Sequence, residues 1–470
     1  MPSLYKKFFS LYSIVLLLMP AYLYAAPANT VVGTVNVGVT PAGLAVTPDN
    51  KFIYVANNNN YGITNGDSVT VINAATNLPV LTITDASFNQ PYTVTINPAG
   101  TIAYVTNSNS STITIINIAT NTVIGTITGF DGPSGMAITP DGNTAYVNNY
   151  GGPGGVGSGN GTTVRVVNLN TNLIVGPAIT VGLAPASLAI TPNGAFVYVI
   201  NYVNGNPGTG TISVIQTSNN TVVDTITGFS GPFAIAINPL GTLAYVTNFG
   251  SNNFAPYGTT VSVVNLNSNT ITATIPVGIQ PSGIAITPDG KYAYASNYNT
   301  LYAATGFADL TPGEGTVNII DIATNTVIPP TIAVGQSPDA VAISPNGQYA
   351  YVSNFASNTV NVIALQSFNI VAKGCKIVDA FLAQINSLIT PVDLINRLTW
   401  SVGGPSLPVS YSIYRDAGLT DLIAMVPAKG PLQFFDHNTL PNVVYTYYLI
   451  GTNAVGTTSE PIVITVTQNC

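Results

Sequence analysis

The sequence predicts an all-β fold, and three observations support this prediction. A tyrosine followed three residues later by an asparagine occurs seven times, at intervals of 42 to 57 residues. Around each pair, apolar and polar residues alternate with a period of two, which is typical of half-buried strands. Each repeat also contains a short turn that begins with proline. The pairs are Tyr54 and Asn57, Tyr104 and Asn107, Tyr146 and Asn149, Tyr198 and Asn201, Tyr245 and Asn248, Tyr294 and Asn297, and Tyr351 and Asn354.

Each repeat predicts four antiparallel strands. In the sixth repeat, the first strand covers residues 283–287 and the second covers 292–297, joined by the turn Pro288-Asp289-Gly290. Proline presets φ at such a turn, and glycine tolerates the positive φ that closes it. Two β-branched segments complete a unit, as residues 260–264 and 270–275 do in the fifth repeat. Because glycine and alanine are frequent in the first strand, we place it innermost, where space is smallest.

Seven such units predict a seven-bladed β-propeller. A single sheet cannot bury both of its faces alone, whereas radial stacking covers each face with a neighbouring sheet. Residues 29–38 have the pattern of a fourth strand but precede the first complete repeat. We therefore expect this N-terminal strand to pair with residues 359–364 and to close the last blade.

The repeat resembles a known family. The tetrapeptide Tyr-Val-Thr-Asn occurs at residues 104–107 and 245–248. The chain therefore resembles the YVTN family of β-propeller repeat proteins over residues 29–372, and this resemblance implies the fold. It implies little about function, because the family is defined by its repeat. Tryptophan-aspartate repeats are excluded, since Trp400 is the only tryptophan.

Residues 1–26 predict a secretory signal peptide. Lys6 and Lys7 precede an apolar run over residues 8–19, and Ala25 and Ala26 follow it. The run is too short to span a bilayer comfortably. We expect cleavage after Ala25 or Ala26 and a secreted, periplasmic or cell-surface protein without a membrane span. A retained N-terminal anchor is the alternative.

The composition excludes nucleic acid as a partner. Charged residues make up 6% of the chain, against about a quarter in typical proteins. Residues 29–371 contain three basic side chains (Lys51, Arg165 and Lys291) and eleven acidic ones, so their net charge is 3 − 11 = −8. Binding to phosphate backbones requires lysine and arginine. The same argument excludes an anionic membrane surface.

The connections between second and third strands are long in five repeats, and all should project from one face. They cover residues 57–67, 150–161, 201–210, 249–258 and 298–315. Their aromatic, asparagine and glycine residues resemble the composition of recognition loops. Neutral insertion is the alternative, because doubling a loop costs only ~0.6 kcal/mol. The predicted ligand-binding residues, with the sixth repeat preferred, are Tyr61, Tyr150, Tyr202, Phe254, Tyr257, Tyr298, Tyr302, Phe307 and Asp309.

Residues 373–470 predict a second, smaller β-sandwich domain after a propeller over residues 27–372. Strands are expected at 398–402, 409–415, 421–426, 445–452 and 462–467, and residues 381–388 fit a strand or a short helix. Residues 440–456 resemble the late strands of a fibronectin type III module. The resemblance implies that Tyr445 is its corner tyrosine and Trp400 its core tryptophan.

Cys375 and Cys470 stand at the two ends of this second domain and are the only cysteines. In an exported chain two cysteines favour a disulfide. A closed loop of this length would stabilise the domain by ~4 to 5 kcal/mol. Two free or intermolecular thiols are the alternative.

The propeller sequence offers little for catalysis. It contains no histidine and no cysteine, which copper and zinc sites require, so we predict no metal and no cofactor. His437 lies outside the propeller and is expected in a turn. Asp309 and Glu314 share a loop, but the other acids are scattered, and turn geometry accounts for several of them. Calcium at Asp67 or Asp309 stays open as an alternative.

These observations predict an exported, non-enzymatic binding scaffold. Its long-loop face would recognise a protein or a glycan at or outside the cell surface. One alternative is a structural cell-envelope protein of the surface-layer kind. A carboxylate-dependent hydrolase or lactonase is the other.

Overall fold

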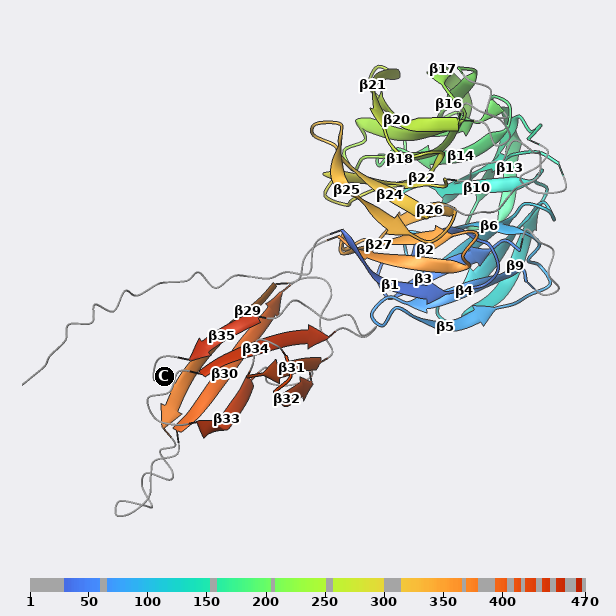
Figure 1. The fold of residues 1–470 in the computed structure, drawn as a ribbon. Coiled ribbons are helices and arrows are strands. Elements are labelled where there is room, and N and C mark those ends of the chain that lie inside the picture. The colour runs from blue at the N-terminus through green and yellow to red at the C-terminus, as the bar shows by residue number, and fades with distance from the viewer. Residues whose placement is uncertain are drawn as a thin grey trace, which may run out of the picture.

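The computed structural model describes residues 29–59, 66–152, 159–203, 208–250, 257–299, 314–365, 369–378, 394–403, 410–415, 419–427, 433–439, 445–452 and 462–466. These residues form strands and turns, as predicted, with seven four-stranded sheets arranged in a ring (Figure 1). The predicted signal peptide lies outside the described residues. No helix within the described part of the chain has the length and apolarity needed to cross a bilayer.

The first four blades follow the predicted order, with each strand pairing with the next. Blade one comprises β2 (Pro41–Val46), β3 (Phe52–Asn57), β4 (Ser68–Asn73) and β5 (Leu78–Ile83). Blade two comprises β6 (Pro91–Ile96), β7 (Ile102–Asn107), β8 (Thr112–Asn117) and β9 (Thr122–Thr128). Blade three comprises β10 (Pro133–Ile138), β11 (Thr144–Asn149), β12 (Thr163–Asn168) and β13 (Leu173–Thr180). Blade four comprises β14 (Pro185–Ile190), β15 (Phe196–Asn201), β16 (Gly210–Gln216) and β17 (Thr221–Phe229).

The remaining three blades complete the ring. Blade five comprises β18 (Pro232–Ile237), β19 (Leu243–Gly250), β20 (Tyr257–Asn265) and β21 (Thr270–Pro276). Blade six comprises β22 (Pro281–Ile286), β23 (Tyr292–Asn297), β24 (Gly315–Asp321) and β25 (Thr326–Val334). Blade seven comprises β26 (Pro338–Ile343), β27 (Tyr349–Asn354), β28 (Thr359–Ala364) and the N-terminal strand β1 (Thr30–Asn36).

The ring closes as the sequence predicts. The innermost strands contact one another in the cyclic order β2, β6, β10, β14, β18, β22 and β26, and β26 contacts β2. Strand β1 pairs antiparallel with β28, with Thr30 opposite Ala364 and Asn36 opposite Thr359. The two ends of the propeller sequence therefore share one sheet.

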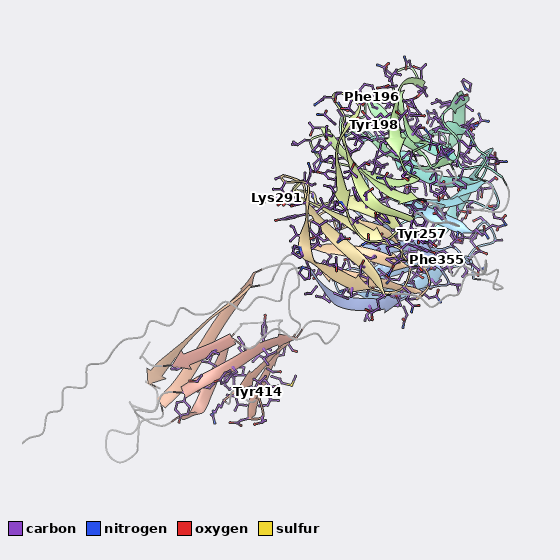
Figure 2. All side chains as sticks on the ribbon, turned by 45° about the horizontal axis from the view of Figure 1, so that its top comes forward. Phe196, Tyr198, Tyr257, Lys291, Phe355 and Tyr414 are labelled. Carbon is purple, nitrogen blue, oxygen red and sulfur yellow. The ribbon has the colours of Figure 1, made fainter. Side chains whose placement is uncertain are left out.

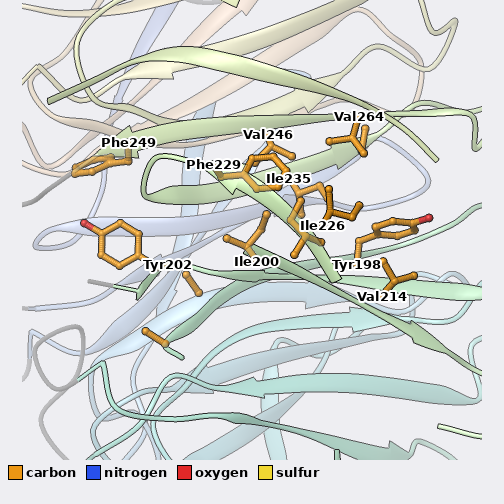
Figure 3. Packing of buried hydrophobic residues seen from close by; sticks show 14 of the residues in the cluster. Tyr198, Ile200, Tyr202, Val214, Ile226, Phe229, Ile235, Val246, Phe249 and Val264 are labelled. Carbon is orange, nitrogen blue, oxygen red and sulfur yellow. The ribbon is translucent and has the colours of Figure 1, made fainter. Parts of the chain in front are cut away.

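The repeat tyrosine joins each blade to the next. The Tyr198 hydroxyl donates to Oδ1 of Asn269 at 2.9 Å, and the Tyr245 hydroxyl donates to Asn325 at 2.7 Å. Each tyrosine ring is buried between blades, and Figure 3 shows the Tyr198 hydroxyl at the edge of its apolar cluster. The equivalent pairs are Tyr54 with Asn121, Tyr104 with Asn172, Tyr146 with Asn220, and Tyr294 with Asn29.

The accepting asparagines share an unusual backbone conformation. Five lie in the turn between third and fourth strands, and Asn29 precedes β1; Asn269 has φ 51° and Asn29 has φ 66°. Asparagine tolerates this left-handed region better than most residues. The seventh interface differs, because the Tyr351 hydroxyl and Asn77 Oδ1 occupy the equivalent places but have no hydrogen-bond partner among the described residues.

The repeat asparagine connects the second strand to the third strand through its side chain. The Asn201 side-chain amide donates to Thr211 Oγ1 at 2.9 Å and Ser213 Oγ at 3.0 Å. Gly182, which precedes blade four, has no space for a side chain, because an added Cβ would lie 2.5 Å from Asn201 Cγ. A glycine is therefore required where the chain passes this amide.

The residue before the repeat asparagine connects neighbouring inner strands. The Thr247 hydroxyl accepts the N–H of Ala234 at 2.9 Å and donates to the carbonyl of Ser282 in the next blade at 2.8 Å. The Thr247 hydroxyl here replaces a backbone hydrogen bond of the β-ladder, because the register between β18 and β19 shifts between Pro232 and Ile235. The shift leaves the second residue of the inner strand outside the regular ladder.

The C-terminal residues form two sheets that share a core. One contains β29 (Asn369–Val378), β30 (Leu394–Gly403) and β33 (Gln433–Thr439). The other contains β32 (Leu422–Pro427), β31 (Ser410–Tyr414), β34 (Tyr445–Thr452) and β35 (Ile462–Val466). Leu398 of the first sheet packs with Tyr411 and Tyr447 of the second, as in a β-sandwich.

The sequence missed two strands of this sandwich. The predicted boundary after residue 372 lies inside β29, and His437, which was expected in a turn, lies in β33. Polar and charged residues interrupt the apolar alternation of both segments. The predicted element at 381–388 lies outside the described residues, and the fibronectin type III resemblance stays a prediction.

We predict that Tyr198→Phe lowers the free energy of unfolding by about 1 kcal/mol, because it removes one interblade hydrogen bond and leaves Asn269 with one donor fewer. Tyr351→Phe is the matched control, since that hydroxyl has no partner among the described residues. It should leave stability unchanged or raise it slightly. Urea unfolding of both variants provides the measurement, and equal losses would contradict the role given to the tyrosine hydroxyl.

Candidate functional site

The second residue of each inner strand differs among blades in a way that the fold does not require. Four blades have a small residue there, but Tyr92, Phe233 and Asp339 occupy this place in blades two, five and seven. We call it the second inner-strand position. All three side chains are half-buried, whereas the small ones are buried. The small residues are Ala42, Ser134, Ala186 and Ser282.

A second set of equivalent residues lies at the same end of the ring. The residue after the repeat asparagine donates its N–H to the carbonyl of the residue before the inner-strand proline, as Tyr150 does to Gly132 at 3.0 Å and Tyr298 to Gln280 at 2.9 Å. This bond places the residue beside the start of the inner strand. Five blades have an aromatic residue here, namely Tyr150, Tyr202, Phe249, Tyr298 and Phe355, and the others have Asn58 and Ser108.

Most of these aromatic residues form one continuous chain of ring contacts. The ring centroids of Tyr202 and Phe233 are 5.9 Å apart, those of Phe233 and Phe249 are 5.2 Å apart, and those of Phe249 and Tyr298 are 5.9 Å apart. Phe355 follows Tyr298 at 6.3 Å. We call these five residues the aromatic arc. Figure 3 shows Tyr202 and Phe249 together at the end of the cluster opposite the Tyr198 hydroxyl.

The arc is held rigidly at one end and is partly open at the other. Tyr202 is 2% exposed, and its hydroxyl donates to the carbonyl of Gly250 at 2.9 Å. Phe233, Tyr298 and Phe355 are only half-buried, so they retain accessible surface. Aromatic contacts of this kind contribute about 0.5–1.5 kcal/mol each, so the arc is ordered before any ligand arrives.

A narrow pocket opens beside the arc. It is lined by Tyr92, Ser134, Ala186 and Phe233 from four inner strands, together with Ser108, Gly132 and Tyr150. The space between these side chains holds about one water molecule. We call this the axial pocket. Its lining combines aromatic faces with hydroxyl groups and contains no charged side chain.

Asp339 is the one carboxyl at the second inner-strand position. Its carboxyl group forms no hydrogen bond or ion pair with the described residues, whereas its backbone carbonyl accepts a hydrogen bond from the Ser296 hydroxyl at 3.3 Å. Burial raises the pKa of the carboxyl to about 7. The Asp339 charge also affects Tyr92. Burial makes the largest contribution and the Asp339 carboxylate the next, and together they raise the pKa of the Tyr92 hydroxyl well above its usual value. Tyr150, Tyr202 and Tyr298 also act on Tyr92, so all these groups lie within electrostatic reach of one another.

No basic side chain of the described propeller balances Asp339. Lys51 pairs with Asp49 at 3.0 Å and Lys291 pairs with Asp289 at 3.6 Å, both in hairpin turns at the opposite end of the inner strands. Lys291 lies well apart from Phe355 in Figure 2. Arg165, the third basic residue, lies in β12 opposite Val147 and away from the inner strands.

The structure places some of the predicted ligand-binding residues. Tyr150, Tyr202 and Tyr298 lie at equivalent positions at this end, while Tyr257 begins β20 opposite Gly250 and makes no ring contact with the arc. The predicted residues Tyr61, Phe254, Tyr302, Phe307 and Asp309 lie outside the described residues. Cys375 lies in β29 and Cys470 lies outside the described residues, so the predicted disulfide stays a prediction.

Sequence reasoning missed the other residues of this end, which are Tyr92, Phe233, Phe249, Phe355 and Asp339. Alignment of the repeats on the inner-strand proline and the repeat asparagine would have found them. They occupy two aligned positions at which some blades have a small or polar residue and others have an aromatic or acidic one. Among the described residues, no three His, Cys, Asp or Glu side chains lie together as metal ligands would. A lone carboxyl with aromatic neighbours can accept hydrogen bonds and attract a cation.

Asp339→Asn should make stability less sensitive to pH. Below about pH 3 the carboxyl is protonated in both the folded and unfolded states, so the substitution has little effect. Between about pH 4 and about pH 7 the unfolded chain releases this proton while the folded protein still holds it, so the wild type loses stability relative to the variant over this range, and the loss is complete above about pH 7. We predict that the variant is more stable above neutral pH by on the order of 2 kcal/mol, measured by urea unfolding between these limits.

Asp141→Asn is the control for this experiment. The Thr139 hydroxyl, and then the backbone N–H of Asn143, lower the pKa of Asp141, which lies in an exposed turn. The ionised Asp141 carboxyl therefore stabilises the folded protein above about pH 4, and Asp141→Asn should be slightly less stable than the wild type at neutral pH, the opposite of the effect of Asp339→Asn. If the free energies of unfolding of the two variants changed with pH in parallel, the result would contradict the burial assigned to Asp339.

Comparisons with known proteins support the β-propeller fold. The profile of the family described as "Lactonase, 7-bladed beta-propeller" matches residues 23–128 and 119–367. Hydrazine synthase of Kuenenia stuttgartiensis has a similar structure, with a TM-score of 0.57 and 22% identity over 70% of this chain and 96% of that chain. At this identity the similarity shows the fold alone.

A shorter similarity links the chain to a PE-PGRS family protein of Mycobacterium tuberculosis. The two are 54% identical over 59 residues, which is 13% of this chain and 13% of the relative. The resemblance to YVTN repeat proteins stays a prediction. The family profile covers well over half of the chain and spans the seven sheets. The chain therefore belongs to the lactonase family of seven-bladed β-propellers.

Proposed function

We propose that this protein is an exported, non-enzymatic binding scaffold whose recognition surface is the aromatic arc with Asp339. The observation that carries this proposal is that three blades have a large or charged residue at the second inner-strand position. Four blades fold with alanine or serine there, so the fold does not need Tyr92, Phe233 or Asp339. A half-buried carboxyl without a counter-ion destabilises a protein, so its presence is best explained by a ligand.

The surrounding architecture supports recognition. Binding sites combine apolar surface with a few polar groups that fix orientation, and this surface combines the arc with hydroxyls and one carboxyl. Ring closure and interblade hydrogen bonds hold these side chains on rigid strands, so little entropy is lost when a ligand binds. The long connections between second and third strands leave from the same end and would extend the surface.

The expected partner is a protein or a glycan at or outside the cell surface. The proposed export rests on the N-terminal segment, with two lysines before an apolar run and small residues after it. The low content of charged residues fits this setting, and the net charge of −7 argues against an anionic partner.

Phe355→Ala should weaken binding at least about tenfold, because it removes the partly exposed end of the arc. The measurement is binding of the mature chain to a glycan array and to a panel of cell-surface proteins. Leu173→Ala is the control, since Leu173 is 62% exposed on an outer strand away from this end. Unchanged binding by Phe355→Ala, with the melting temperature retained, would contradict the proposed surface.

Lactone hydrolysis is a second candidate function, and one observation favours it beyond the family description. A carboxyl with a pKa of about 7 is suited to general acid or base catalysis near neutral pH. Lactone opening also develops negative charge on oxygen, which enzymes stabilise with positive groups or with several aligned donors. The described surroundings of Asp339 offer tyrosine hydroxyls and no basic side chain, so we favour binding.

Hydrolysis of γ- and δ-lactones distinguishes the two functions. We expect the wild type and Asp339→Asn to give the same background rate in a pH-stat assay. Wild-type turnover that disappears in Asp339→Asn would establish the second candidate and remove the first. Turnover that survives in Asp339→Asn would place the chemistry elsewhere.

A further inference from the structure

We propose that the aromatic arc and the Asp339 carboxylate together bind an organic ammonium cation, with a methylated ammonium group as the preferred form. This inference rests on the proposed function, because it names the ligand class of the same surface. It follows from three features of the described residues around the axial pocket: the accessible aromatic faces, the uncompensated carboxyl, and the scarcity of strong hydrogen-bond donors.

The aromatic faces provide the first feature. The face of an aromatic ring is electron-rich and attracts a cation within about 6 Å of its centroid. Phe233, Tyr298 and Phe355 remain half-buried and belong to one chain of ring contacts. A trimethylammonium group could contact several of these faces at once. Each desolvated face contributes roughly 2- to 30-fold in affinity.

The carboxyl provides the second feature. Asp339 stands in the inner strand of blade seven, beside the inner strands of blades one and six, where the equivalent residues are Ala42 and Ser282. The titratable group that faces it is Tyr92, whose pKa burial and the Asp339 charge raise. No described lysine or arginine pairs with it, since Lys51 and Lys291 have partners at the opposite end. A bound cation would supply the missing positive charge.

The scarcity of donors in the described lining of the axial pocket provides the third feature, and it favours an ammonium group over other ligand classes at this place. An anion would meet one carboxylate and several ring faces, and both repel negative charge. A neutral sugar in the axial pocket would require many paired donors and acceptors, whereas the Ser108 and Ser134 hydroxyls of its lining already donate to the carbonyls of Gln90 and Ala186. A methylated ammonium group needs no acceptor besides a nearby negative charge. Because the pocket holds about one water molecule, this group would rest over its opening, against the arc.

Choline and its neutral analogue 3,3-dimethyl-1-butanol test the inference, because they share a shape and differ in charge. At about pH 8, when Asp339 is ionised, isothermal titration of the mature chain should show that choline binds at least about tenfold more tightly than 3,3-dimethyl-1-butanol. Choline affinity should fall as the pH decreases through about 7, where the carboxyl takes up a proton. Equal affinities for the two compounds, or no choline binding at millimolar concentrations, would overturn the inference.

Two variants complete the test. Asp339→Asn should weaken choline binding about tenfold and remove its pH dependence, while Asp141→Asn, in an exposed turn at the other end, should change neither. Unchanged choline binding by Asp339→Asn would overturn the inference. If choline fails to bind but an array ligand still depends on Phe355, the ammonium inference is wrong and the proposed function stands. If no ligand depends on Phe355, both are wrong.

Discussion

The packing of the repeat tyrosine between neighbouring blades is the interaction on which the ring depends, and at six of the seven interfaces its hydroxyl donates to an asparagine of the next blade. The tyrosine ring fills the space between two sheets, and its hydroxyl must find a partner where it emerges from the apolar core. Asparagine supplies that partner because it can adopt the left-handed conformation of the outer turn. Tyr294 forms the same bond with Asn29 at the start of the N-terminal strand, so closure repeats the contact that joins the other blades.

A second recurring contact explains why a binding site can arise at the end of the ring that contains the axial pocket. Hydroxyls such as those of Thr247 and Ser353 replace ladder bonds at the start of the inner strands and reach the carbonyl of the next blade. The second residue of the inner strand is thereby released from pairing. Its side chain can change from alanine to tyrosine, phenylalanine or aspartate without disturbing the sheet. Variation at this position is therefore available for function.

The sequence predicts the ring well because repetition is a strong signal. Seven tyrosine and asparagine pairs give the number of blades, and the stray fourth-strand pattern at residues 29–38 gives the closure. The site is harder to predict, because Tyr92, Phe233 and Asp339 each occur once and create no periodicity. Attention to loop length led to residues such as Tyr302 and Phe307, which lie outside the described residues. In the second domain, Lys373, Gly374 and Lys376 break the apolar alternation of β29, so the strand was missed.

The central claim is that the three exceptional inner-strand residues serve a ligand and not the fold. The most direct measurement is the unfolding free energy of a triple variant with Tyr92→Ser, Phe233→Ala and Asp339→Ser, which restores small residues in all seven blades. The account predicts that stability changes by no more than about 2 kcal/mol, because the loss of half-buried aromatic contacts is offset by removal of an uncompensated carboxyl. Failure of the triple variant to fold would show that these residues support the ring itself and would contradict the account.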